Sequence, residues 1–434
     1  MEKWLKISLL LSIFGVLKEF RPIEPFITEF LTNPPLNLSK ETVTFEIYPI
    51  GVYSNMLELI IVFLVTDYFR YQPVIVTSAI SGLIVYLILS FGKTLIWMQA
   101  TQIFYGLFLA GDIAYYSYIY AKVDKEHFQE VTSHTRSAYL LGRTISGVTS
   151  QLCVTYNLLT YYQMNFLTIG GLSLAVLWSL SLPKVEHSFY FHRKTEETVE
   201  ENAIGRSSST IIRNDDVTGD SNNFADVIRT MGKDIKYTMS SAKIIFPILW
   251  SVVATSCYYQ VLSFVQLLWH HIAKSNGEDQ ELWNGAVETT YTLLGAVGTL
   301  SASKIKLRWD EFGNLICGVS IFFMAVMLFI MSQTGILWIA YATLITFNII
   351  YQVTITFVNS EIAKGLKEDS YGLIFGFTMF LSLTMQTIIT LIFVNGLKLS
   401  FRLQFVSYCC YLLPFGLIFL SKALLTISRR FCIN

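Results

Sequence analysis

Long hydrophobic runs separated by short polar segments dominate this chain from end to end. Each run is close to the roughly 20 residues that a helix needs to cross a membrane. The pattern predicts twelve such spans, near residues 5–31, 46–66, 73–91, 96–121, 134–157, 161–182, 244–269, 283–303, 312–331, 336–360, 370–394 and 401–427. The sequence therefore predicts an all-α integral membrane protein with twelve transmembrane helices.

One long polar segment, residues 184–242, interrupts this pattern. It contains a Glu-rich stretch at 196–201 and a Ser-rich stretch at 206–210, and it has few aromatic residues. This composition is typical of a flexible, partly disordered linker. Six spans on each side of a linker is the layout of transporters built from two related halves. We expect an N-terminal half over 1–183 and a C-terminal half with a short cytosolic tail over 243–434.

The distribution of basic residues predicts the orientation in the membrane. If both termini and the linker are cytosolic, the inside loops hold most of the 31 Lys and Arg residues. The outside loops then hold Lys40, Lys93, Lys274, Lys398 and Arg402. The sequon Asn37-Leu38-Ser39 falls in the first outside loop, where a glycan could be attached to Asn37.

Composition excludes several classes of function. Hydrophobic residues make up 53% and charged residues 14% of the chain, and the formal net charge is zero, so nothing favours nucleic acid as a partner. The six cysteines lie mostly in apolar runs and indicate small buried side chains. The six histidines lie in loops or at span ends, without catalytic or metal-binding motifs. We expect no enzyme activity, no cofactor and no metal, and the lipid bilayer as one partner.

Asp112 is the most informative residue, because no other charge lies between Lys93 and Lys122. An acid at this depth in a membrane costs about 2.5–3.5 kcal/mol, so it is rarely exposed to lipid. Two interpretations are open at this point. The carboxylate either contacts a substrate in a cavity or forms a structural ion pair with a neighbouring helix.

Helical spacing places Tyr105, Tyr115 and Tyr116 on the same face as Asp112. A carboxylate surrounded by aromatic rings suits a cationic, aromatic ligand, through charge attraction and cation–π contacts. Arg143 in the fifth span is the natural partner of Asp112 if the two helices are adjacent. That ion pair is the main alternative to a carboxylate that binds substrate.

Other polar residues lie inside the predicted spans. The first span holds Arg21 and Glu24, which either pair with each other or divide the roles of anchor and substrate contact. Pro22 and Pro25 interrupt this helix and free backbone groups that need partners. Further candidates for substrate contacts are Tyr48, Arg143, Asn284, Glu288 and Gln386. Each of them could instead form hydrogen bonds between helices.

Several motifs make the chain resemble the folate/thiamine carrier family, which contains the reduced folate carrier and the thiamine transporters. They are Phe20-Arg21-Pro22-Ile23-Glu24-Pro25-Phe26, residues 66–74, residues 113–120, Asn284-Gly285-Ala286-Val287-Glu288 and residues 386–390. The resemblance implies a major facilitator fold and uptake of a water-soluble vitamin. It also implies that Asp67 and Arg70, in the loop after the second span, tie helices together and gate inward opening.

The resemblance also bears on the choice of vitamin. Folate carriers resemble each other in an Arg at the position of Asp112, a Lys at Gln386 and an Arg near Asn348, and this chain lacks all three cations. Thiamine transporters have an acid at the position of Asp112, as here. Two positions depart from the thiamine pattern: Gly51 replaces an aromatic residue and Arg143 replaces a Tyr.

We therefore expect a plasma-membrane carrier for thiamine or a related cationic vitamin, with cytosolic termini. The expected substrate contacts are Glu24, Tyr48, Asp112, Tyr115, Tyr116, Arg143, Asn284, Glu288 and Gln386. The first alternative is a carrier of folate or another organic anion, with Arg143 and Arg21 as cationic contacts. The second is a receptor or scaffold without transport activity. Proton antiport, anion exchange and facilitated diffusion are all compatible with the sequence.

Overall fold

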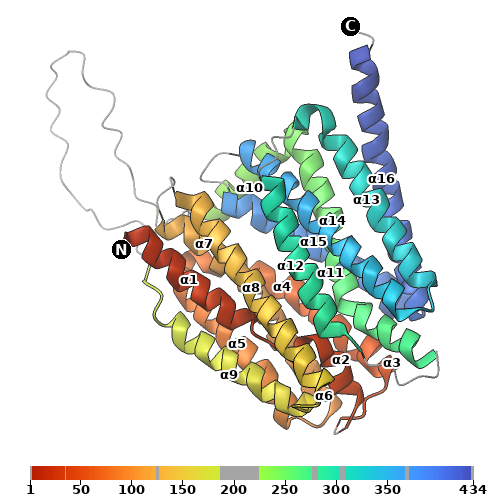
Figure 1. The fold of residues 1–434 in the computed structure, drawn as a ribbon. Coiled ribbons are helices and arrows are strands. Elements are labelled where there is room, and N and C mark those ends of the chain that lie inside the picture. The colour runs from red at the N-terminus through yellow and green to blue at the C-terminus, as the bar shows by residue number, and fades with distance from the viewer. Residues whose placement is uncertain are drawn as a thin grey trace, which may run out of the picture.

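The computed structural model of the chain describes residues 2–34, 36–123, 127–185, 224–275, 282–303, 308–366 and 371–431. Within these ranges the chain forms helices and connecting turns, with no strand (Figure 1). The chain before the linker forms α1 (Lys3–Glu19), η1 (Glu24–Phe26), α2 (Ile27–Thr32), α3 (Lys40–Thr42), η2 (Val43–Ile47), α4 (Tyr48–Tyr68), α5 (Gln72–Phe91), α6 (Leu95–Ala110), α7 (Asp112–Lys122), α8 (Phe128–Thr155) and α9 (Tyr161–Ser179).

The remaining helices are α10 (Phe224–Met239), α11 (Ala242–Ser275), α12 (Asn284–Ser303), α13 (Trp309–Gln333), α14 (Leu337–Lys364), α15 (Tyr371–Ile389), η5 (Thr390–Gly396) and α16 (Phe401–Phe431). Helices thus occupy all twelve predicted spans. Among the described residues, seven segments are long and apolar enough to cross a membrane by length and composition. The predicted all-α fold with membrane-spanning helices is confirmed.

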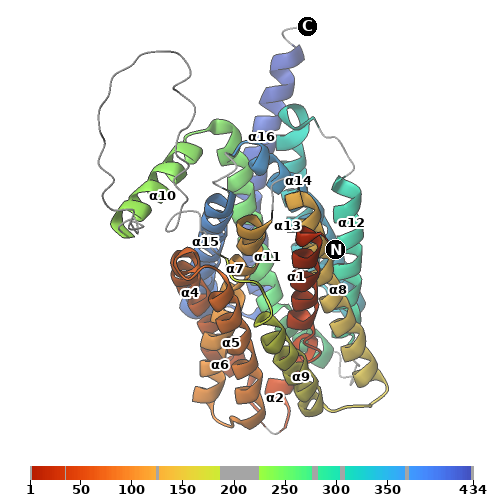
Figure 2. The same ribbon diagram turned by 90° about the vertical axis from the view of Figure 1, so that its left-hand side faces the viewer.

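The helices before and after the linker pack mainly within their own group. In the first group, α1 packs on α8, α4 and α5 pack on α6, and α5 packs on α9. In the second group, α13 packs on α16 and α14, and α11 packs on α14 and α15. The two groups meet chiefly where α8 packs on α12 and where α4 packs on α15 (Figures 1 and 2). Two helix groups that meet along two seams leave room for a space between them.

The first predicted span is broken where its prolines predicted a break. Helix α1 ends at Glu19, and the chain resumes as the short helices η1 and α2. Pro25 lies inside η1 and has no backbone N–H to donate, so the preceding carbonyls are left for other partners. Because of this interruption, Arg21 lies in a non-helical stretch after α1, and Glu24 is the first residue of the single turn η1.

The fourth predicted span differs from the expectation of one helix. It consists of α6 and α7, which are separated at Gly111, so that Asp112 is the first residue of α7. A Cβ atom at Gly111 would overlap the side chain of Ser78 on α5, which shows how closely the two segments approach. Backbone hydrogen bonds continue across Gly111, from its N–H to the Leu107 carbonyl and from the Tyr115 N–H to its carbonyl, so α7 continues the direction of α6.

The linker is more ordered than predicted at its C-terminal end. Helix α10 lies within the predicted linker and packs on α11 and α15. Its amphipathic pattern is too short and too charged to resemble a membrane span, which explains why the hydrophobic pattern missed it. The predicted disorder of residues 186–223 concerns a segment outside the described residues.

The α8–α12 seam depends on glycines at the contact. A Cβ atom at Gly285 of α12 would lie 2.7 Å from the carbonyl oxygen of Gly147 and 2.9 Å from the backbone nitrogen of Gln151, both on α8. These are backbone atoms, which have little freedom to move aside. Small residues at such seams let helices approach closely.

We predict that Gly285→Ala destabilises the protein by about 1–3 kcal/mol, the usual cost of overpacking. The measurement is thermal unfolding of the purified protein in detergent. Gly170→Ala is the matched control, because nothing lies within 4 Å of a Cβ atom at Gly170. Equal melting temperatures for the two variants would contradict the close seam.

Candidate functional site

A cavity of about 1730 Å³ lies between the two helix groups and is lined by residues from both. Ligand pockets usually measure about 300–1,000 Å³, so this cavity is larger than a closed binding pocket. Its lining includes the exposed residues Ser137, Ser360 and Lys364 at the end where α10 lies. The cavity therefore opens at the α10 end of the molecule, the end predicted to be cytosolic.

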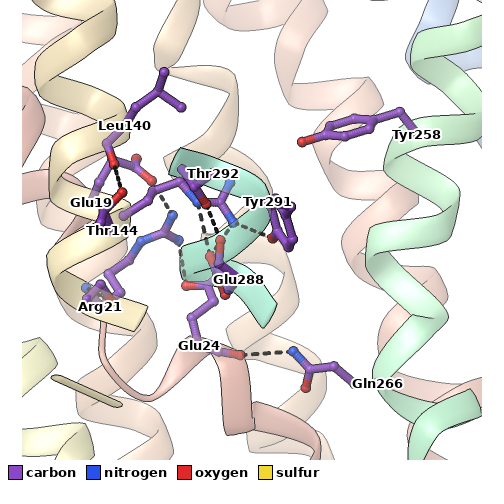
Figure 3. A network of polar contacts seen from close by, with 12 residues as sticks. Glu19, Arg21, Glu24, Leu140, Thr144, Tyr258, Gln266, Glu288, Tyr291 and Thr292 are labelled. Atoms are coloured by element: carbon purple, nitrogen blue, oxygen red, sulfur yellow. Dashed lines mark hydrogen bonds and ion pairs between the residues drawn. The ribbon is translucent and has the colours of Figure 1, made fainter. Parts of the chain in front are cut away.

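The opposite end is closed by amide side chains that bind the broken first span. The Gln266 Nε2 amide of α11 donates to the Glu24 carbonyl at 3.1 Å, as Figure 3 shows. The Asn284 Nδ2 amide of α12 donates to the Pro25 carbonyl at 3.0 Å. The hydroxyl of Tyr341 donates to Asn284 Oδ1 at 3.4 Å. Backbone carbonyls of the broken first span thus accept hydrogen bonds from the other helix group.

A cluster of five charged side chains forms one wall of the cavity. Lys18 forms an ion pair with Asp112. Arg21 forms ion pairs with Glu19 at 2.7 Å and with Glu24 at 2.6 Å (Figure 3). If all five side chains are ionised, three carboxylates face two cations, and the cluster carries a net charge of −1.

The cations of this cluster are hidden, whereas two of its carboxylates reach the cavity. The side chains of Lys18 and Arg21 are 3% and 6% exposed, whereas those of Asp112 and Glu24 are 30% and 24% exposed. Both cations also lie over the buried ring of Phe108, at 4.6 Å for Lys18 Nζ and 5.1 Å for Arg21 Cζ. The cavity therefore meets mainly the negative side of the cluster.

Glu24 receives two phenol hydrogen bonds in addition to its ion pair. Tyr86 of α5 donates to Glu24 Oε2 at 2.7 Å, and Tyr105 of α6 donates to Oε1. Neutral donors stabilise a carboxylate without cancelling its charge. The structure thus places Tyr105 in the cavity wall, with its hydroxyl committed to Glu24 and not to Asp112.

Arg143 does not pair with Asp112, so the ion pair that the sequence offered between these two residues is absent, but Asp112 does form an ion pair, with Lys18 of α1. Its Nε and Nη2 atoms donate to Glu288 Oε1 at 3.1 and 2.5 Å, and Nη2 also donates to the hydroxyl of Tyr291 at 3.4 Å. Arg143 lies on α8, whereas Glu288 and Tyr291 lie on α12. This ion pair therefore joins the two helix groups. The partner of Asp112 is Lys18, a residue that the sequence analysis had not connected with it.

The predicted tyrosines divide between the cavity and the protein core. Tyr116 lines the cavity beside Asp112. Tyr115 is buried, and its hydroxyl donates to the Leu11 carbonyl at 3.0 Å, so the expectation that it faces the cavity is wrong. Tyr48 lines the cavity, and its hydroxyl is 2.8 Å from Thr28 Oγ1.

The amide side chains of Gln386, a predicted contact, and of Gln260 have different surroundings. Gln386 lies in the cavity wall on α15 and is 3% exposed. Gln260 is fully buried, donates to the hydroxyl of Tyr408 at 3.0 Å and accepts a hydrogen bond from Thr390. Gln260 of α11 thus joins α16 and η5 through hydrogen bonds.

Aromatic rings on α11 and α14 form the wall opposite the charged cluster, and one arginine of α8 also lines the cavity. The rings of Tyr258 and Tyr351 stack at 4.1 Å, and Tyr258 points into the space across from the cluster in Figure 3. Arg136 of α8 lines the same part of the cavity and donates to Gln352 Oε1 at 3.3 Å. Within the described part of the chain, no carboxylate forms an ion pair with Arg136.

The sequence analysis missed Arg136, although a signal for it was present. Arg136 and Arg143 are seven residues apart, so they lie on the same face of one helix.

Of the predicted gating pair, Arg70 is exposed with a positive φ of 59° after the end of α4. The side chain of Asp67 lies outside the described part of the structure. Asn37, the predicted glycosylation site, is exposed in the loop between α2 and α3.

Comparison with known proteins gives the chain a family context. The profile of the family described as reduced folate carrier matches residues 2–407. The chain is 35% identical to human thiamine transporter 2, over 98% of this chain and 90% of that protein. It is 32% identical to folate-like transporter 2 of Caenorhabditis elegans, over 99% of both chains. These relatives are transporters, in agreement with the expectation of a carrier and not an enzyme.

Solved structures support the fold. A POT family transporter in complex with a thioalcohol-conjugated peptide is similar with a TM-score of 0.65 and 11% identity, over 96% of each chain. The nucleoside transporter NupG gives a TM-score of 0.57 and 12% identity, over 97% of this chain and 99% of that one. At this identity the likeness concerns the fold alone, which is that of major facilitator transporters.

We predict that Arg143 and Glu288 are energetically coupled, with an interaction energy of about 0.5–3 kcal/mol. Each single variant, Arg143→Gln or Glu288→Gln, leaves a partly buried charge without its partner, whereas the double variant removes both charges. A double-mutant cycle by thermal or denaturant unfolding measures this coupling. Additive single-variant effects would contradict a contact between α8 and α12 through this pair.

Proposed function

This chain belongs to the reduced folate carrier family, and on that premise we propose that it imports thiamine or a related cationic vitamin across the plasma membrane by alternating access. Relatives named thiamine transporters, from human and mouse, are 31–35% identical to it over nearly its whole length. Relatives named folate transporters are of similar identity. The choice between the two vitamins therefore rests on the chemistry of the cavity.

The observation that carries the proposal is the negative wall of the cavity. Asp112 and Glu24 present partly exposed carboxylates, while their cationic partners are buried against Phe108. Thiamine carries a permanently positive thiazolium ring, so it gains charge attraction at this wall. A folate glutamate tail would instead bring further negative charge to a cluster that already has an excess of one carboxylate.

The aromatic side chains of the cavity complement such a ligand. Tyr116 lies beside Asp112, and the stacked pair Tyr258 and Tyr351 lies on the other helix group. A flat cationic heterocycle between these walls would contact carboxylate on one side and ring faces on the other. Of the polar candidates, Asn284 lies at the closed end of the cavity, where it binds the Pro25 carbonyl. Gln386 lies in the cavity wall on α15.

Alternating access requires the closed end to open. The Arg143–Glu288 ion pair joins the two helix groups at that end. The hydrogen bonds donated by the side-chain amides of Gln266 and Asn284 join them there as well. For an outward-open state these contacts separate, and the α10 end closes around the midplane site. Cytosolic termini and a glycan at Asn37 belong to the same proposal, since they place the α10 end inside and the first loop outside.

A carrier of organic anions is the second candidate, because one observation favours it. Arg143 and Arg21, the cations first expected to serve an anion, are both engaged by carboxylates. Arg136 has no carboxylate partner among the described residues and lines the cavity. It is therefore the cationic contact to which a carboxylate or phosphate substrate would bind.

We expect Asp112→Asn to raise the KM for radiolabelled thiamine uptake about tenfold, which corresponds to about 1.4 kcal/mol of lost binding. Uptake by cells expressing the chain, normalised to surface protein, is the measurement. Asp310→Asn is the matched control, because Asp310 is exposed and pairs with Lys243 on the surface. The double variant Lys18→Met/Asp112→Asn checks whether an unpaired Lys18 causes the loss. Unchanged uptake in Asp112→Asn removes this residue from the mechanism.

We expect excess unlabelled thiamine, and not folate, to block uptake, because in the charged cluster the carboxylates of Asp112 and Glu24 are more exposed than their cationic partners. The measurement is a side-by-side substrate screen with thiamine, pyridoxine and folate in the same cells. Uptake that only folate inhibits, and that Arg136→Gln abolishes, would establish the anion carrier in place of the cation carrier.

A further inference from the structure

Helix α10 carries a basic face that no part of the proposed transport cycle uses. Arg229, Lys233, Lys236 and Tyr237 are exposed, and the side chain of Tyr237 is 72% exposed. Their spacing of four, three and one residues places them on one side of the helix. A run of three cations beside one exposed aromatic ring is a recognisable surface, which we name the basic face of α10.

The opposite face of α10 fixes the helix to the transporter. Met231 and Thr238 are each 6% exposed. Met231 packs in a small cluster with Leu373 of α15, Phe63 of α4 and Ile235. Helices α4 and α15 form one of the two seams between the helix groups. The basic face is thus held in a defined orientation over that seam.

The position of α10 brings it to the membrane boundary. Only Ser240 and Ser241 separate its last residue from α11, which begins a membrane-crossing segment at its next residues. The Ser240 N–H donates to the Lys236 carbonyl at 3.1 Å, which ends α10 in a tight turn. Figure 2 shows α10 running outward from the end of α11, beside α15 and outside the bundle. So short a connection keeps α10 close to the lipid headgroups.

We propose that the basic face of α10 binds anionic phospholipid headgroups of the cytosolic leaflet. Each Lys or Arg near an anionic leaflet strengthens association about fivefold, so three of them make a substantial site. Exposed tyrosines are typical of the headgroup region, where the ring and the hydroxyl meet different surroundings. The interaction does not depend on which vitamin is carried, because the basic face lies outside the cavity.

Lipid is favoured over a protein partner by the placement of this face. Helix α10 lies beside lipid-facing surface, since Ile60 and Ile61 of α4 and Ile245 of α11 are exposed apolar residues. A helix with cations on one face and a neighbouring apolar surface is typical of proteins that rest on an anionic membrane. Headgroups bound there would also lie next to the α4–α15 seam, where the two helix groups move relative to each other in the proposed cycle.

A probe at position 237 in the full-length chain tests the proposal. Tyr237→Cys, in a Cys410→Ser/Cys432→Ser background, is labelled with a fluorophore and reconstituted into phosphatidylcholine vesicles with or without about 30 mol % phosphatidylserine. Quenching by headgroup spin-labelled lipid measures the approach of the probe to the membrane. We expect quenching to rise at least twofold with phosphatidylserine and to fall again in high salt.

Charge reversal distinguishes the basic face from a general effect of the lipid. Lys233→Glu/Lys236→Glu should abolish the gain from phosphatidylserine. The matched control Lys93→Glu/Lys398→Glu, at exposed positions at the opposite end of α5 and α15, should retain it. Equal quenching in both lipids, or a gain that survives the reversal, overturns the proposal. If the reversed variant does not fold, the lipid and salt dependence of the unreversed chain decides.

Discussion

The structure depends on how it accommodates five charges where the first span is broken. Charges inside a membrane protein are tolerated when they are paired or face water. Here Lys18 and Arg21 gain both carboxylate partners and the ring of Phe108, which allows them to be almost completely buried. The break that places Glu24 in this cluster also brings the backbone carbonyls of Glu24 and Pro25 within reach of Gln266 and Asn284. One interruption of a helix therefore builds both the wall of the site and its closed end.

The two ends of the molecule are held together unequally. At the closed end an ion pair and several hydrogen bonds join the helix groups, whereas near the open end Arg136 donates one hydrogen bond to Gln352. Opening the closed end means separating partly buried charges, so it requires compensation from elsewhere. Under the proposed function a cationic substrate would supply part of that compensation, because it would neutralise the excess carboxylate of the cluster while the helix groups move.

Much of the fold follows from the sequence, because long apolar runs predict the membrane spans and prolines predict the broken helix. The charged partners could not be predicted in the same way. Helix adjacency does not decide which cation meets Asp112, because α8, which carries Arg143, does pack on α7. Arg143 nevertheless pairs with Glu288 of α12, and Lys18 pairs with Asp112. Tyr115 and Tyr116 differ by about 100° around a helix, so a small rotation decides which ring faces the cavity. The break at Gly111 and the helix α10 also depend on tertiary contacts.

The identity of the partner decides how Asp112 can serve a ligand. A guanidinium would bind the carboxylate through a rigid pair of hydrogen bonds, and its release would be costly. Lys18 has a flexible chain and a compact charge, and its ammonium already lies 4.6 Å from the centre of the Phe108 ring. When a cationic ligand approaches Asp112, the ammonium retains this ring as a second favourable contact. Under the proposed function, a cation at Asp112 would therefore share the carboxylate with Lys18, whose ammonium keeps its contact with the Phe108 ring.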